Sequence, residues 1–162
     1  SVRSRLISEK DMVKQASEFA GTVPVRHLLP YWKTSNRYLF SGGSVNMRDA
    51  AVYAKEENWS KAVELWKQTY ETKKGKQKMY AAYNTALGYE MQDSIDTALE
   101  WALKAQTLAR EKSKTDKKET GEIHDGTISY YIFISMYVDE LEKRKEGMAR
   151  LNMQMNRFDD DF

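Results

Sequence analysis

The stretch NWSKAVELW at residues 58–66 is matched in pattern 36 positions later by SIDTALEWA at residues 94–102. Upstream of these stretches, Ala50 has its counterpart in Ala86, again 36 positions later. A period of this length, with small and large apolar residues at helical spacing, is typical of stacked helical hairpins. The sequence therefore predicts an all-α protein built on two consecutive helical pairs.

The repeat also predicts where the helices begin and end. In the first pair, residues 45–75, the outer helix carries apolar residues three and four positions apart, which form one stripe. These residues are Trp59, Ala62, Val63, Trp66 and Tyr70. The second pair spans residues 77–110. Asn58 precedes the outer helix of the first pair and Ser94 precedes that of the second, and both residue types cap helix N-termini. Gly75 is expected to end the first pair.

Composition supports a helical domain and excludes several classes of protein. The chain has 162 residues, which fits one ordinary domain, and 31% of them are charged while only two are proline. The net charge of +2 demands no strongly anionic partner. The chain contains no cysteine, so it forms no disulfide, yet this leaves its compartment open.

Beyond the repeats, we expect a polar loop followed by a long helix. Residues 111–121 are polar and lack periodicity, which predicts an exposed loop. Residues 121–158 are apolar nearly all round at first and then carry a narrower stripe, which predicts a C-terminal helix that caps the stack. Residues 130–134 alone would also suit a buried strand. Residues 159–162 are expected to form a frayed acidic tail.

The first 44 residues are interpreted as a divergent N-terminal helical hairpin. Residues 6–20 have a helical pattern that Gly21 and Pro24 interrupt, and Pro30 suits the first turn of a second helix. The Ser-Gly-Gly-Ser run at residues 41–44 would end it. Residues 1–158 are thus predicted to form a single helical-repeat domain.

The repeat resembles the tetratricopeptide (TPR) family, whose motif alternates small and large residues at fixed positions. The matching residues are Ala50, Tyr53, Trp59, Ala62 and Trp66 in the first copy, and Ala86, Tyr89, Ile95 and Ala98 in the second. The period of 36 exceeds the usual ~34, and Lys74 and Arg110 replace the usual proline near each repeat end. The resemblance implies an α-solenoid that acts as a non-enzymatic scaffold for a protein or peptide partner.

A second resemblance concerns location. The motifs Pro-Tyr-Trp at 30–32, Arg-Tyr at 37–38 and Trp-Ser-Lys-Ala at 59–62 are similar to the TPR-containing tail of lipoproteins from Bacteroides-type bacteria. This implies an exported or envelope-associated protein, in the periplasm or at the outer membrane, with a possible lipid anchor upstream. A cytoplasmic location stays an alternative. No stretch has the ~20 apolar residues of a transmembrane segment. The start at Ser1 is interpreted as that of a processed product.

The resemblance also implies a binding groove on the inner helices. The candidate residues are Met47, Ala51, Lys55, Tyr80, Tyr83, Asn84, Leu87 and Met91. Two interpretations stay open: the groove receives an extended or helical peptide, or the C-terminal helix fills it. Asn84 matches an asparagine of the carboxylate clamp found in some TPR proteins, but Met47 and Ala51 stand where that clamp needs Lys and Asn.

Nothing in the sequence predicts an enzyme, a metal site or a cofactor. The two histidines, His27 and His124, lack the neighbouring ligands of a zinc site. Glu64 and Glu100 recur at equivalent repeat positions and are interpreted as exposed residues, not as an acid/base pair. Residues 42–44 lack the Gly-Lys-Ser/Thr ending of a phosphate loop.

Nucleic acid and glycan are the two partner classes other than protein. Residues 73–78 and 112–118 are rich in lysine, but no aromatic residues are interleaved with the lysines, which argues against nucleic acid. The alternative function is a glycan-binding accessory protein at the bacterial cell surface. Trp32 and Trp101, which lie off the repeat motif, would stack on sugar rings in that case.

Overall fold

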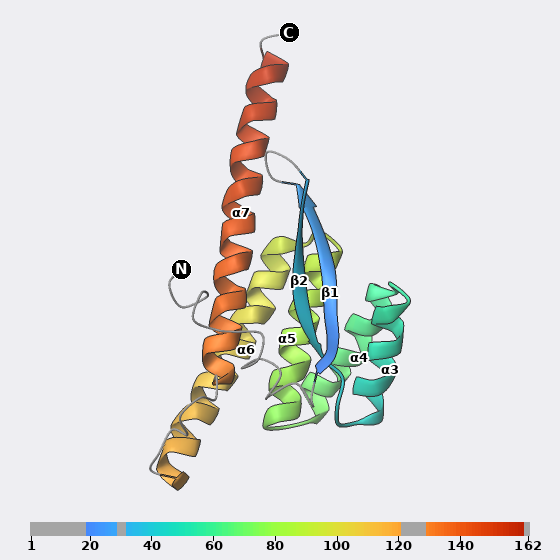
Figure 1. The fold of residues 1–162 in the computed structure, drawn as a ribbon, viewed down its shortest axis with the longest axis vertical. Coiled ribbons are helices and arrows are strands. Elements are labelled where there is room, and N and C mark those ends of the chain that lie inside the picture. The colour runs from blue at the N-terminus through green and yellow to red at the C-terminus, as the bar shows by residue number, and fades with distance from the viewer. Residues whose placement is uncertain (1–18, 29–31, 121–128, 161–162) are drawn as a thin grey trace.

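The computed structural model of the chain describes residues 19–28, 32–120 and 129–160. Within these residues the fold is mostly helical, with one small antiparallel sheet (Figure 1). The elements are β1 (Phe19–Leu28), β2 (Trp32–Phe40), α3 (Val45–Lys55), α4 (Trp59–Thr72), α5 (Lys76–Met91), α6 (Ile95–Thr120) and α7 (Tyr130–Asp160).

Each helix packs against the next one along the chain, from α3 through α7. The predicted outer stripe faces this core, where Ala62 and Trp66 are fully buried. Gly88 of α5 packs tightly against α4, since a Cβ atom at that position would come within 2.3 Å of Val63 Cγ2. The small and large residues of the repeat thus serve helix packing.

The predicted helix boundaries around the first pair are confirmed. The Asn58 side chain accepts a hydrogen bond from the Lys61 backbone N–H at 3.4 Å, as an N-cap should. Helix α4 ends at Thr72 with Lys73 as its C-cap. Gly75, whose φ of 63° favours glycine, is the N-cap of α5 and does not itself end α4. Ser44 caps α3 by accepting a hydrogen bond from Met47 N–H, so residues 42–44 lead into a helix and do not end one.

The predicted N-terminal helical hairpin is wrong for residues 19–40, which form a β-hairpin. Strands β1 and β2 pair antiparallel, with Leu28 opposite Trp32 and Val25 opposite Ser35. Burial along β1 alternates, since Val25 and His27 are buried while Pro24 and Arg26 are exposed. That period of two, with β-branched residues, outweighs the helical interpretation. The helix expected at residues 6–18 lies outside the described residues.

The predicted loop at residues 111–121 is also wrong over most of its length, because α6 continues to Thr120. This segment has no proline and is rich in Lys and Glu, which are good helix formers, so polarity alone did not mark a loop. The C-terminal helix is present as α7 from Tyr130 and extends into the predicted tail as far as Asp160. Its first turns are helical, which excludes the alternative strand at residues 130–134. Residues 121–128 lie outside the described part.

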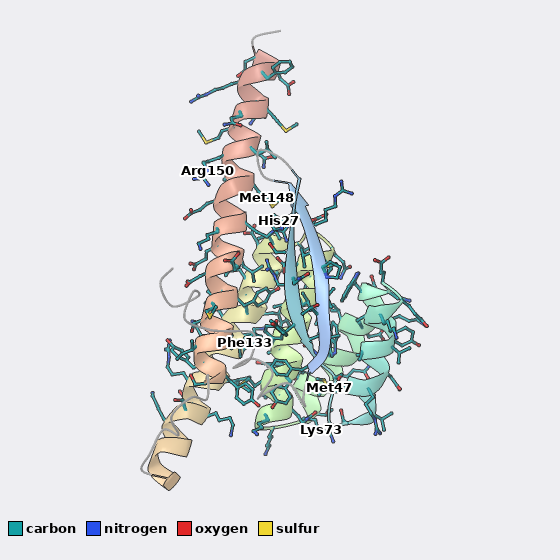
Figure 2. The ribbon with its side chains drawn as sticks, viewed as in Figure 1. His27, Met47, Lys73, Phe133, Met148 and Arg150 are labelled. Atoms are coloured by element: carbon teal, nitrogen blue, oxygen red, sulfur yellow. The ribbon has the colours of Figure 1, made fainter. Side chains whose placement is uncertain are left out.

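The β-hairpin lies across α5, between α7 on one side and α3 on the other (Figure 1). Phe40, at the end of β2, stacks on Tyr80 with ring centroids 4.1 Å apart and meets Tyr83 edge-on at 5.2 Å. Phe133 of α7, labelled in Figure 2, joins this aromatic cluster with its ring 6.1 Å from the Phe40 ring and 5.4 Å from the Tyr83 ring. The hairpin is therefore part of the core.

The repeat register makes a direct prediction about stability. Trp66→Ala should lower the free energy of unfolding by about 3–5 kcal/mol, because it leaves a cavity between packed helices. Glu64→Ala, on the exposed face of the same helix, should change it by less than about 0.5 kcal/mol. Chemical denaturation of both variants checks this. Equal midpoints for the two would contradict the register.

Candidate functional site

The groove predicted on the inner helices is largely filled by the chain itself. Five of its eight candidate residues are buried in the core: Met47, Tyr80, Tyr83, Asn84 and Leu87. Residues of β2 and α7 contact Tyr80 and Tyr83, and β2 is hydrogen-bonded to Asn84, so these side chains are not accessible to a partner. The groove interpretation is wrong for these five residues, and the C-terminal helix accounts for only part of the covering.

Helix α5 holds β2 through the strand's backbone. The Asn84 amide accepts a hydrogen bond from the Phe40 N–H at 3.1 Å and donates one to the Phe40 carbonyl at 2.6 Å. The Tyr83 hydroxyl donates to the Tyr38 carbonyl at 2.7 Å. Because an unsatisfied buried polar group destabilises the fold, these bonds allow a strand edge to be buried against a helix. Asn84 therefore has a structural role here.

A buried carboxylate connects the same strand to α7. Glu90 of α5 accepts two hydrogen bonds from the Arg37 guanidinium, at 3.0 and 3.1 Å. It accepts further bonds from Arg144 at 2.8 Å and from the Tyr137 hydroxyl at 3.0 Å. All four side chains are buried. We call Arg37, Glu90, Tyr137 and Arg144 the Glu90 cluster.

The protonation of the Glu90 cluster follows from its contacts. Burial alone would raise the pKa of the Glu90 carboxyl, but the hydrogen bonds and charges of Arg37 and Arg144 outweigh it and lower the pKa below its ordinary value. Burial also raises the pKa of the Tyr137 hydroxyl well above its ordinary value, with a further contribution from the Glu90 charge. Glu90 is thus ionised and Tyr137 is neutral at pH 7.

Sequence reasoning missed the Glu90 cluster, although one signal was present. Tyr83, Leu87 and Glu90 are spaced four and three positions apart on α5, so Glu90 continues a buried stripe. A carboxylate on such a stripe needs a cationic partner, since an unpaired buried charge is very costly. The partners, Arg37 and Arg144, lie 53 residues before it and 54 after it. No local pattern identifies them.

An open cleft remains beside the filled part of the groove. Its volume is about 570 Å³, and it lies between β1 and α3. The lining residues are Thr22, Val23, Pro24, Leu39, Ser41, Ala51, Val52, Ala54, Lys55, Glu57, Trp59 and Met91. Three of the eight predicted groove residues, Ala51, Lys55 and Met91, are therefore brought together in this cleft, which we call the β1–α3 cleft.

The β1–α3 cleft is chemically suited to binding. Leu39, Trp59 and Met91 supply apolar surface, while Lys55 and Glu57 place one charge of each sign at its exposed parts. Val52, which also lines it, is 56% exposed and so is accessible to a bound molecule. An apolar cavity with a few polar groups at its edge matches the general character of ligand sites.

The glycan interpretation finds no support at Trp101. This side chain is only 8% exposed, and its ring lies edge-on to Tyr70 at 5.0 Å. The ammonium group of Lys104 lies 4.0 Å from the centroid of the indole ring. A sugar ring therefore finds no open indole face on which to stack. The side chain of Trp32 lies outside the part of the structure that is described.

The other sequence candidates lie apart from the cleft lining. Glu64 and Glu100 are exposed on α4 and α6, as expected for helix surface positions. His27 is buried in β1, and His124 falls outside the described residues. Across residues 19–28, 32–120 and 129–160, no three His, Asp or Glu residues converge as metal ligands would. In the same ranges, no helix has the length and apolar content needed to cross a bilayer.

Comparison with known proteins gives two family matches. Residues 48–143, more than half of the chain, match the family described as Domain of unknown function (DUF6340). Residues 1–40 match a second family, described as Domain of unknown function (DUF8603). No curated protein and no solved structure matches the chain. The second match ends with the last residue of β2, and the DUF6340 match begins at Arg48 within α3, so residues 41–47 lie between the two matched segments.

The Glu90 cluster predicts a large effect of removing one charge. Glu90→Gln removes the carboxylate that both buried guanidinium groups share and leaves Arg144 only the exposed Asp93 carboxylate, 3.8 Å away, so the free energy of unfolding should fall by about 3–5 kcal/mol. Glu100→Gln, on the exposed surface, is the matched control and should change it by less than about 0.5 kcal/mol. Urea denaturation of the two variants measures this, and a neutral Glu90→Gln would refute the role of the cluster.

The same carboxylate predicts how stability depends on pH. The folded-state pKa of Glu90 lies below its unfolded-state pKa, so its stabilisation is complete above the unfolded value. The stabilisation is then lost as the pH falls through the lower, folded value. Melting temperatures between pH 7 and pH 2.5 should therefore fall more steeply for the native chain than for Glu90→Gln. Parallel curves would show that Glu90 does not contribute.

Proposed function

The chain belongs to the family described as Domain of unknown function (DUF6340), and we propose that it is a non-enzymatic module that binds a segment of a protein partner. The proposal rests on the β1–α3 cleft, which stays open while five of the eight predicted groove residues are buried. The partner segment would occupy this cleft, against Ala51, Val52 and Lys55 of α3.

The shape and composition of the cleft support a peptide over a small polar ligand. It lies between a helix and a strand, so an occupant would run along both elements (Figure 1). Among the described residues β1 pairs only with β2, and a strand edge is a common docking site for an extended segment. Met91 adds a flexible side chain that adapts to different apolar groups.

We extend the proposal to the architecture and location of the protein. The 36-residue repeat and the sequential packing of α3 through α6 support two hairpins of the TPR type, with β2 placed where such arrays receive ligands. The resemblance to Bacteroides-type lipoproteins supports an envelope-associated protein in the periplasm or at the outer membrane, anchored by lipid upstream. Both statements are proposals that rest on sequence pattern.

Site-specific photo-crosslinking in the source cell tests the function. A photoreactive phenylalanine analogue at Val52 should give adducts with a protein partner, because this residue lines the cleft and is accessible. The same analogue at Glu64, exposed on α4 and absent from the lining, should not give those adducts. Equal adducts at both positions, or none at Val52, would contradict the proposal.

The identified partner then allows a quantitative prediction. Val52→Asp should weaken its binding by at least about 1–2 kcal/mol, because a charge replaces an apolar contact at the cleft. Val45→Asp is a matched control: Val45 lies on the same helix and is 59% exposed, but it does not line the cleft. Calorimetric affinities, with melting temperatures for both variants, check this. Equal losses of affinity would place the site elsewhere.

A further inference from the structure

Three lysine side chains from α4, α5 and α6 converge on one pair of aromatic rings. The rings of Tyr70 and Trp101 meet edge-on, with their centroids 5.0 Å apart. The ammonium group of Lys104 lies 4.0 Å from the Trp101 centroid and 5.8 Å from the Tyr70 centroid. Lys67 lies 5.9 Å from the Trp101 centroid, and Lys78 lies 4.6 Å from that of Tyr70. We call these five residues the lysine–aromatic patch.

The positive charges of the patch are not paired with carboxylates of the chain. In the described part of the chain none of its three ammonium groups forms an ion pair, whereas Lys143 and Lys145 do. Glu100 precedes Lys104 by one helical turn, a spacing that often gives an ion pair, yet the ammonium group lies over Trp101 instead. An anionic ligand would therefore displace no existing ion pair.

Contacts with the rings hold the ammonium groups in place. A cation above an aromatic face is attracted by the negative charge of that face. Lys67 also donates a hydrogen bond to the Tyr89 hydroxyl at 3.2 Å. Side chains that are fixed before a ligand arrives lose less conformational entropy on binding. The patch is thus a preorganised set of positively charged donors.

The patch lies apart from both the hairpin and the β1–α3 cleft. None of its five residues lines that cleft. Lys78 is two positions before Tyr80, which stacks on Phe40 of the hairpin, so the two side chains point to nearly opposite sides of α5. The turn between α4 and α5 adds the exposed Lys73, labelled in Figure 2, and Lys74. The positive charge therefore extends past the patch into this turn.

We propose that the lysine–aromatic patch is a second docking surface, which takes an acidic segment of a partner protein. Lys104 contacts both rings of the pair, while Lys67 contacts one ring and Lys78 the other, so the three charges form a row. A row of ammonium groups complements successive Asp or Glu side chains along a chain. Trp101 is only 8% exposed, so it offers no open face on which a nucleic acid base could stack.

A fluorescently labelled hexaglutamate peptide, added to the full chain at low ionic strength, tests this charge recognition. Binding should be saturable and should weaken as salt is added. The double variant Lys67→Gln, Lys104→Gln should raise the Kd at least about fivefold. The matched double variant Lys61→Gln, Lys143→Gln removes the same charge outside the patch and should raise the Kd less than about twofold. Lys61 lies over the ring of Tyr53, at 5.3 Å, so this control also removes a lysine–ring contact.

Equal effects of the two double variants, or no saturable binding by the native chain, would overturn the proposal. Melting temperatures of both variants verify that they are folded. Inorganic tripolyphosphate is the second probe. If it binds through Lys67 and Lys104 while hexaglutamate does not bind, the patch takes phosphate groups and the acidic segment is wrong.

NMR locates the bound peptide. During the hexaglutamate titration the indole N–H resonance of Trp101 should shift, while that of Trp59, which lines the β1–α3 cleft, should not. A shift at Trp59 alone would place the acidic peptide in the cleft and overturn the patch as its site. That result would leave the function proposed for the cleft intact, so the two proposals fail separately.

Discussion

The structure depends on one buried carboxylate. Glu90 lies on the helix that is buried on nearly all sides, and it joins a strand near the start of the chain to the last helix through Arg37 and Arg144. A buried charge is tolerated only when it is fully paired and hydrogen-bonded, so the three elements must be present together. The Tyr137 hydroxyl supplies the remaining hydrogen bond.

The pairing of Glu90 with Arg37 holds the hairpin against the helices and so determines which part of the surface stays open. The hairpin packs against α5 and α3, and its aromatic residue Phe40 contacts the rings of Tyr80 and Phe133. Asn84 and Tyr83 satisfy the backbone of the inserted strand, so the groove is closed by polar as well as apolar contacts. What remains accessible is the β1–α3 cleft, to which the hairpin itself contributes one wall.

Sequence alone was sufficient for the helical pairs and insufficient for the hairpin. The caps and the packing residues of the pairs are local signals: Asn58 and Trp66 could be identified from their spacing. Strand β2 was not predicted, because its burial depends on Glu90, Asn84 and α7, which lie more than 40 residues away. Of the candidate groove residues, Ala51, Lys55 and Met91 line the β1–α3 cleft, whereas the ones that β2 covers are buried.

Native-state hydrogen exchange followed by NMR tests the central claim, that the hairpin and the helices form one cooperative core. The Phe40 amide donates its hydrogen bond to Asn84, and the amides of α5 lie in the most buried helix. If the claim holds, Phe40 exchanges as slowly as the slowest α5 amides, because both open only when the domain unfolds. Exchange at Phe40 several orders of magnitude faster than in α5 would show that the hairpin detaches independently and would contradict the account.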